Sequence, residues 1–150
     1  MLFRSEGAKS IHVPQGSEQF YGENRGNLRE FTHLVIDSGA DLVLGHGPHV
    51  LRAMEIYKDR LIAYSLGNFA TYGWFSLRDA TALTAILEAR LAPDGRFLGG
   101  KIHPGRQEGR GIPTLDRAGE AIKKIRDLSQ TDFGATAPRI ADDGTLTSQK

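Results

Sequence analysis

Residues 39–51 have the sequence GADLVLGHGPHVL, and this stretch decides the fold that we expect. Its apolar run at 42–44 lies close to flanking glycines, which is typical of a short buried strand. Two histidines, His46 and His49, follow within one tight turn that contains glycine and proline. In open α/β sheets, ligands bind at the loops that follow the carboxyl ends of strands. The stretch therefore predicts a buried strand that delivers two imidazoles to a candidate ligand site.

A helix is predicted directly before this strand, over residues 27–40. Its apolar residues recur at helical spacing, namely Leu28, Phe31, Leu34 and Val35. We expect Asn24 or Asn27 to cap its start and Gly39 to cap its end. A helix that leads straight into a buried strand indicates a layered α/β domain.

Two hairpins, a loop and a second helix are predicted after the strand. The first hairpin has arms at 54–57 and 61–65 around a turn at 58–60, and the second begins with the alternating segment 83–91 and turns at 93–95. Residues 105–114 are expected to form a glycine-rich loop, and residues 116–130 an amphipathic helix with Ala118, Ile122, Ile125 and Leu128 inward. We assign residues 1–134 to one domain and residues 135–150 to a polar tail that should fray.

The composition excludes several classes of protein. The chain has 150 residues, 39% hydrophobic and 25% charged, which is ordinary for one globular domain. Its net charge of +1 gives no reason to expect a nucleic-acid partner. Cysteine is absent, which excludes disulfides, thiolate metal sites and cysteine nucleophiles. No apolar run approaches the ~20 residues of a membrane span, so none is predicted in this chain.

Four side chains could carry chemistry in or near this first sheet. His46 and His49 are candidate metal ligands, because neutral imidazole binds Zn, Fe, Ni and Cu and is tolerated by Mn in mixed sites. The alternative is one hydrogen-bonded histidine that caps the strand and one exposed histidine. Glu55 is a metal ligand, a partner that holds a histidine tautomer, or a surface acid. Asn68, at a strand end, either donates its amide to an oxyanion, ligates a metal, or is a turn residue.

The remaining polar residues have simpler interpretations. Glu23 and Arg25 precede the first helix and could form an exposed ion pair, worth ~0.5 kcal/mol. His33 lies mid-helix beside the apolar face, so we expect it to pack against the core. His103 precedes a proline, which predicts an extended stretch with the ring at the solvent or the core edge.

Residues 37–70, DSGADLVLGHGPHVLRAMEIYKDRLIAYSLGNFA, resemble the C-terminal signature of the CapA family. These are poly-gamma-glutamate capsule biosynthesis proteins of the metallophosphoesterase-like superfamily. The signature has four parts in order: an Ala-Asp strand, a Gly-His-x-Pro-His turn, a Glu-x-Tyr strand and a Tyr-Ser-Leu-Gly-Asn-Phe strand end. A looser resemblance extends over roughly residues 6–130.

The resemblance implies a fold and a metal centre. The fold is a four-layer α/β sandwich, with two mixed sheets flanked by helices, of which this chain supplies part. The centre is a two-metal site for divalent ions such as Mn, Fe or Zn, with His46 and His49 as its last ligand pair. Many relatives have a histidine at the position of Gly47, so the resemblance favours His49 as the firmer ligand.

The resemblance also implies that part of the domain is encoded elsewhere. Family members begin with a Gly-Asp metal motif and an Asn-containing motif, and neither is in this sequence. A third motif, ending in His-Gly-x-x-Glu, is matched only by Glu6 and Gly7, with Leu2 at the histidine position. We therefore expect this chain to be the C-terminal portion of a larger protein, lacking the N-terminal half of the domain. As an isolated chain it should bind divalent metal weakly.

The function implied is a metal-dependent phosphoesterase-type hydrolase in cell-envelope polymer synthesis, extracytoplasmic or membrane-associated. Its partners would be a cell-envelope polymer or phosphoester substrate and other capsule-synthesis proteins. Glu55 would contact a ligand or the substrate, Asn68 would position a reacting group, and the cleft rim would include Glu6, His12, Glu23 and Arg25. The alternative is a non-catalytic assembly or polymer-handling subunit with the same fold.

Overall fold

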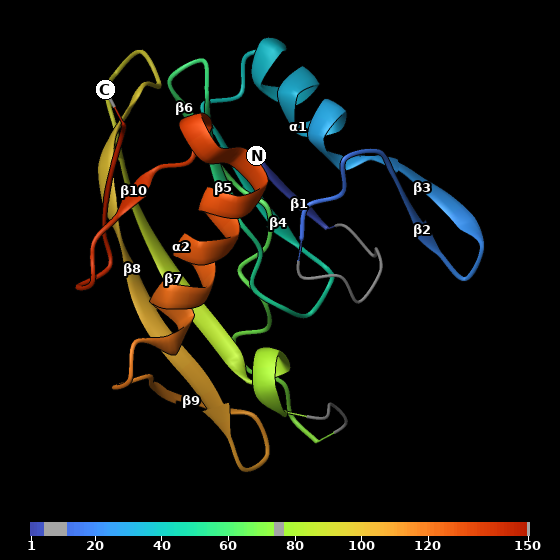
Figure 1. Ribbon diagram of the computed structural model, residues 1–150, viewed down its shortest axis with the longest axis vertical. Coiled ribbons are helices and arrows are strands. Elements are labelled where there is room, and N and C mark those ends of the chain that lie inside the picture. The colour runs from blue at the N-terminus through green and yellow to red at the C-terminus, as the bar shows by residue number, and fades with distance from the viewer. Residues whose placement is uncertain (5–11, 74–76, 150) are drawn as a thin grey trace.

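The computed structural model describes residues 1–4, 12–73 and 77–149 as a mixed α/β structure (Figure 1). Its elements are, in order, β1 (Leu2–Arg4), β2 (Ser17–Phe20), β3 (Glu23–Asn27), α1 (Leu28–Asp37), β4 (Leu42–His46), β5 (Met54–Tyr57), β6 (Arg60–Ala63), η1 (Asp79–Thr81), β7 (Leu83–Leu91), β8 (Phe97–Glu108), β9 (Ile112–Leu115), α2 (Glu120–Phe133), η2 (Gly134–Thr136), β10 (Arg139–Ile140) and β11 (Thr145–Thr147). The predicted α/β class is confirmed. Within the described ranges, neither α-helix has the length and apolar character needed to cross a bilayer.

The smaller of two main sheets has the strand order β1-β4-β6-β5. Strand β4 pairs in parallel with both β1 and β6, and β5 returns antiparallel to β6. Because these two pairings are parallel, the carboxyl ends of β1, β4 and β6 lie at the same edge of the sheet. The segments that follow β4 and β6 therefore leave the sheet side by side, which is the place where open α/β sheets bind ligands.

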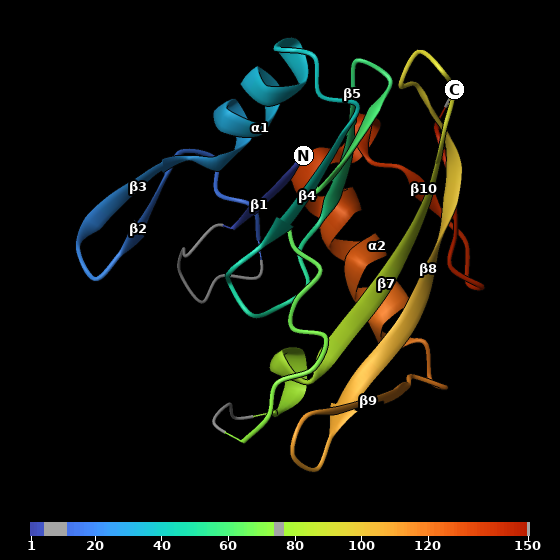
Figure 2. The ribbon, with the colours of Figure 1, turned by 180° about the vertical axis from the view of Figure 1, so that it is seen from behind.

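The smaller sheet is buried on both faces. One face packs Val43, Ile62 and Tyr64 against α1, and the opposite face packs Met54, Leu61 and Ala63 against the larger sheet and α2. Seen from behind, α1 lies on one side of this sheet, and the long strands β7 and β8 lie on the other (Figure 2). Burial on both faces explains why β4 is a continuous apolar run rather than an alternating one.

The larger sheet has the strand order β10-β11-β8-β7, with β9 also paired to β8. The alternation at 83–91 and the turn at 93–95 are confirmed as strand β7 and the β7–β8 turn. Two expectations are wrong. The 105–114 segment is not a loop, because β8 continues to Glu108 and β9 pairs back onto it. The chain after 134 does not fray, because β10 and β11 join the sheet and bury Ile140 and Leu146.

Helix α1 faces the core with a different stripe from the predicted one. Phe31 and Leu34 are 42% and 64% exposed, whereas Thr32 and Ile36 are buried. Thr32 is tolerated inside because its hydroxyl donates to the Tyr64 hydroxyl at 3.1 Å. The buried stripe therefore follows i, i+4 spacing from Leu28, and a polar group occupies one of its positions.

Helix α2 begins at Glu120, four residues later than predicted. Asp116 lies before it, and its carboxylate accepts from the backbone N–H groups of Ala118 and Ala121 at 3.2 and 2.8 Å. Ala118 is therefore part of the turn and exposed, not an inward helical residue. The expected inward positions Ile122, Ile125 and Leu128 are confirmed.

Asn27 is the residue that caps α1, and its loss should weaken the helix. Its Oδ1 accepts from the backbone N–H of Glu30 at 3.2 Å, which resolves the choice between Asn24 and Asn27. We expect Asn27→Ala to lower the free energy of unfolding by about 1 kcal/mol, measured by urea denaturation. Asn27→Asp keeps an acceptor there and should be close to wild type. Equal losses in both variants would contradict the capping role.

Candidate metal-ligand turn

The turn after β4 is held against the segment that follows β6. Leu51 forms an isolated antiparallel bridge with Leu66, and the Ser65 hydroxyl donates to the carbonyl of Val50 at 2.7 Å. The Leu66 N–H donates to the carbonyl of Gly45 at 3.2 Å. These contacts bring the two sequence motifs, the histidine turn and the Gly-Asn strand end, to one place.

Both candidate histidines use Nδ1 to contact that second segment. His46 Nδ1 lies 3.2 Å from the carbonyl oxygen of Gly67, and His49 Nδ1 lies 2.8 Å from Oδ1 of Asn68. A carbonyl oxygen only accepts, so each Nδ1 carries the proton. The neutral imidazole then has its lone pair on Nε2. This is the arrangement by which proteins prepare a histidine to bind a metal through Nε2.

The backbone of the turn is also unusual. Gly47 has φ of 127° and His49 has φ of 61°. A left-handed φ at a non-glycine residue is uncommon, and such positions cluster at functional sites. The backbone of His49 therefore has a conformation that its intrinsic preference does not favour. The contact with Asn68 can hold its ring in place.

The described residues do not form a complete metal site. Across 1–4, 12–73 and 77–149, no cluster of three or more histidine, aspartate or glutamate side chains could hold a metal ion. Two imidazoles from one turn fit the donor chemistry of zinc, iron or manganese but fall short of four to six ligands. His46 and His49 therefore suit a ligand pair, and not a closed site.

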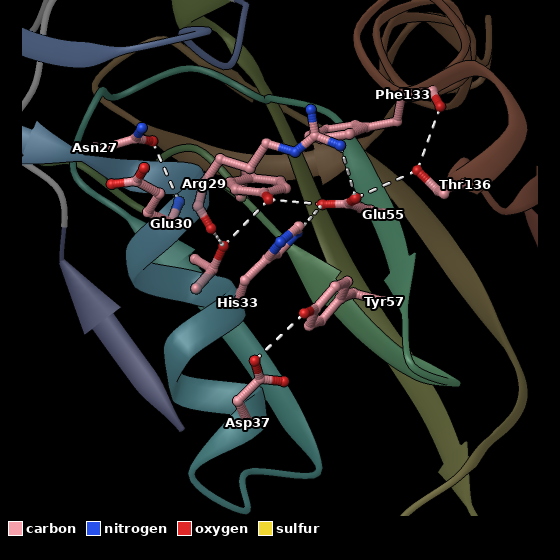
Figure 3. Close-up of polar contacts among 11 residues, drawn as sticks. Asn27, Arg29, Glu30, His33, Asp37, Glu55, Tyr57, Phe133 and Thr136 are labelled. Atoms are coloured by element: carbon pink, nitrogen blue, oxygen red, sulfur yellow. Dashed lines mark hydrogen bonds and ion pairs between the residues drawn. The ribbon is translucent and has the colours of Figure 1, made fainter.

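Glu55 is buried at the centre of a separate polar cluster, shown in Figure 3. Its side chain is 1% exposed, so the surface-acid interpretation is wrong. Its carboxylate accepts from His33 Nε2 at 2.9 Å and from the Tyr64 hydroxyl at 2.8 Å. Arg29 Nη2 and the Thr136 hydroxyl each lie 3.3 Å from the other carboxylate oxygen. Glu55 does hold a histidine, but that histidine is His33 on α1.

The ring of His33, on α1, contacts two residues of β5, Tyr57 and Glu55. Its ring stacks on Tyr57 with centroids 3.7 Å apart, while Nε2 faces Glu55. The Tyr57 hydroxyl donates to Asp37 at 3.3 Å, as Figure 3 also shows. A hydrogen bond from Lys58 lowers the pKa of Asp37. The prediction that His33 packs against the core is confirmed, with a buried ionic partner that the sequence did not reveal.

Tyr64 should make the protein sensitive to alkali. Burial, followed by the Glu55 carboxylate, raises the pKa of its hydroxyl far above the usual value. In the unfolded chain this tyrosine ionises near pH 10, whereas in the folded chain it stays protonated, so stability falls as pH rises above 10. We expect wild type to lose about 1 kcal/mol more stability than Tyr64→Phe between about pH 10 and 11, measured by urea unfolding. Parallel losses in both proteins would contradict this assignment.

The expected cleft-rim residues have other partners or lie outside the described part. Glu6 lies outside the described residues. Glu23 and Arg25 form the predicted ion pair, at 2.8 Å on strand β3. His12 Nδ1 donates to Asp132 on α2 at 2.7 Å, and Asp132 also accepts from the Val13 N–H. His103 is exposed on β8 as expected.

Sequence comparison finds a family that is similar to the part of the chain that contains this turn. Residues 10–72 match the family model described as bacterial capsule synthesis protein PGA_cap. The match spans the helix α1, the histidine turn and the Gly-Asn strand end. Over these residues the chain is similar to the CapA family.

Individual proteins are similar to the same part of the chain. The PGA biosynthesis protein CapA of Bacillus subtilis is 34% identical over 79 residues, which is 52% of this chain and 20% of the relative. The capsule biosynthesis protein CapA of Bacillus anthracis is 37% identical over 76 residues, 50% of this chain and 18% of the relative. A probable polyglutamine synthesis accessory protein of Mycobacterium tuberculosis is 36% identical over 58 residues, 39% and 15% of the two chains.

These matches cover about a fifth or less of each CapA relative. The activity, substrates and partners of the complete relatives therefore come to this chain only as proposals.

Proposed function

We propose that this chain carries a ligand pair, His46 and His49, of the divalent metal centre of a CapA-type phosphoester hydrolase in capsule polymer synthesis. The observation that supports this most is the pair of Nδ1 contacts, to Gly67 and Asn68. They direct both Nε2 lone pairs to metal binding at the sheet edge where α/β proteins bind ligands. Similarity to capsule synthesis proteins suggests the biological setting of the proposal.

A divalent metal at this turn would polarise a phosphoryl oxygen and activate water for attack. The chain's own residues then have defined parts in the proposal. His46 and His49 hold the metal, and Asn68 keeps the His49 ring in the binding tautomer. Glu55 acts at a distance by fixing α1 against the sheet. Further ligands and the substrate pocket come from the rest of the family fold.

The proposal includes the four-layer sandwich of the superfamily. Two sheets and one flanking helix, α1, account for three layers. The outer face of the larger sheet exposes Ile86, Leu98 and Leu115 at 52%, 52% and 62%. In our proposal a helical layer from the remainder of the domain covers these exposed apolar side chains.

Metal binding tests the ligand pair directly. We expect the chain to bind Zn²⁺ or Mn²⁺ weakly, and His49→Ala and His46→Ala to reduce the affinity at least tenfold, by isothermal titration calorimetry. His103→Ala is the matched control, because His103 is exposed on β8 and pairs with Glu88 at 3.4 Å. Unchanged affinity in His49→Ala, or an equal loss in His103→Ala, would refute the assignment.

A second candidate function is an accessory role without hydrolysis. The naming of the mycobacterial relative as a probable polyglutamine synthesis accessory protein favours it. A phosphodiesterase assay with Mn²⁺ on a CapA protein that contains this sequence separates the two. Turnover that needs the metal and disappears on chelation supports the hydrolase, whereas metal binding without turnover supports the accessory role.

A further inference from the structure

Gln107 on β8 connects the larger sheet to the residues that orient both histidines. Its side chain is 3% exposed, and its two ends contact one short segment. Nε2 donates to the backbone carbonyl of Asn68 at 2.9 Å. Oε1 accepts from the N–H and the hydroxyl of Thr71, at 2.8 and 2.6 Å. The segment from Asn68 to Thr71 is thus held at both ends by one amide.

Gln107 itself is rigidly placed. Its N–H donates to the carbonyl of Ala82 at 2.8 Å, and its strand pairs with β7 on one side and β9 on the other. A buried amide near the end of a paired strand loses little further freedom when it binds a neighbouring loop. It is therefore well suited to determine where that loop lies.

Both histidine acceptors lie beside this anchor. Gly67 bridges to Thr84 of β7, and a Cβ at Gly67 would come within 3.1 Å of the carbonyl of Leu83. Its own carbonyl accepts from His46, and the next residue, Asn68, accepts from His49. The acceptors that select both ring tautomers thus belong to backbone that the larger sheet holds.

The Asn68 side chain depends on that backbone for its direction. Its Nδ2 is buried and makes no hydrogen bond to the described residues. The contact to His49 is therefore the one hydrogen bond that this side-chain amide makes with the described part of the chain. Where the Asn68 backbone lies decides whether Oδ1 reaches His49, and the Gln107 bond fixes the Asn68 backbone.

We propose that Gln107 is a positioning residue that acts through Asn68 to hold His49 in the Nδ1–H tautomer. The consequence for metal binding rests on the proposed function, whereas the tautomer assignment does not. The larger sheet, the strand-end segment and the histidine turn are then connected by hydrogen bonds. The larger sheet contributes none of the candidate metal ligands among its described residues, but through Gln107 it orients a residue of the histidine turn.

The tautomer of His49 can be observed without metal, by long-range ¹H–¹⁵N NMR of the ring nitrogens in the full chain at about pH 8.5, where imidazole is neutral. Wild type should show Nδ1–H at His49. Gln107→Met should shift the ring toward Nε2–H, as should the positive control Asn68→Ala. Thr71→Val removes one contact to Oε1 but keeps the bond to Asn68, and should retain the wild-type tautomer. Gln130→Met, on the exposed side of α2, controls for the substitution itself.

Gln107→Glu covers the case in which Gln107→Met fails to fold. It keeps an acceptor for Thr71 but faces the Asn68 carbonyl with a second acceptor, so it should also change the tautomer. Wild-type ring signals in a folded Gln107 variant would overturn the proposal. Zn²⁺ affinity, measured on the same proteins, should fall about 10- to 100-fold in Gln107→Met. If the tautomer changes but wild type binds no Zn²⁺, the positioning role stands and the metal function fails.

Discussion

Glu55→Ala is expected to lower the free energy of unfolding by about 3–5 kcal/mol, because it removes one partner from a buried ionic cluster. The carboxylate is the acceptor shared by His33, Tyr64, Arg29 and Thr136. Without it, the Tyr64 hydroxyl stays fully buried and loses its acceptor. The free energy of unfolding of a typical domain is only about 5–15 kcal/mol, so this loss should be easy to detect in a denaturant titration.

Two matched variants make this expectation specific. Glu88→Ala removes an exposed glutamate from β7 and should change stability by less than about 0.5 kcal/mol. Glu55→Gln keeps the shape and one acceptor and should fall between wild type and alanine. If Glu55→Ala lowered the free energy of unfolding no more than Glu88→Ala, the cluster would not contribute to stability.

The Glu55 cluster matters because it joins elements that are distant in the sequence. Arg29 and His33 come from α1, Glu55 from β5, and Thr136 from the turn after α2 (Figure 3). Arg29 also lies over the Phe133 ring, 5.1 Å from its centroid. The cluster thus fixes one face of the sheet whose parallel strand β4 ends at His46. If the chain binds metal as we propose, loss of Glu55 should therefore also weaken that binding, with no direct contact required.

The sequence predicted the fold best where local pattern and final environment agree. The strand at 42–45, the hairpin at 54–65 and the turn at 93–95 were identified because apolar runs and turn residues report directly on short-range structure. The stripe of α1 was misassigned because Thr32 is buried by a hydrogen bond, which hydrophobic spacing does not detect. Strands β9, β10 and β11 were missed because they are short and depend on strand pairing: β9 and β11 pair with β8, and β10 pairs with β11.

The candidate site shows a similar division. His46, His49, Glu55 and Asn68 were singled out by residue type and position, and the structure joins His49 to Asn68. The contact between Glu55 and His33 was not predicted, because the helical pattern indicated only that His33 packs against the core. Gln107 was missed because it contacts Asn68 across 39 positions of sequence, and nothing in its own strand distinguishes it. Local patterns find chemical groups, whereas long-range packing decides which of them meet.

Arg52→Met should also destabilise the protein by about 3–5 kcal/mol, because it leaves a buried carboxylate without its guanidinium. Arg52 is fully buried, Glu18 on β2 is 6% exposed, and their Nη1 and Oε1 atoms lie 2.6 Å apart. Arg25→Met, which breaks an exposed pair with Glu23 on the same hairpin, should cost less than about 1 kcal/mol. Urea denaturation of the three proteins measures the difference.

The double variant Glu18→Gln/Arg52→Met separates the ion pair from packing. Replacing both charges removes the desolvation penalty together with the attraction, so the double variant should be more stable than Arg52→Met alone. Additive losses would mean that Arg52 acts through packing only. The pair also ties the β2–β3 hairpin to the chain just after the histidine turn, and an isolated two-stranded hairpin is marginally stable. Amide exchange in β2 and β3 should therefore accelerate in Arg52→Met and remain slow in Arg25→Met, because the buried pair joins the hairpin to residue 52, whereas Glu23 and Arg25 both lie on β3.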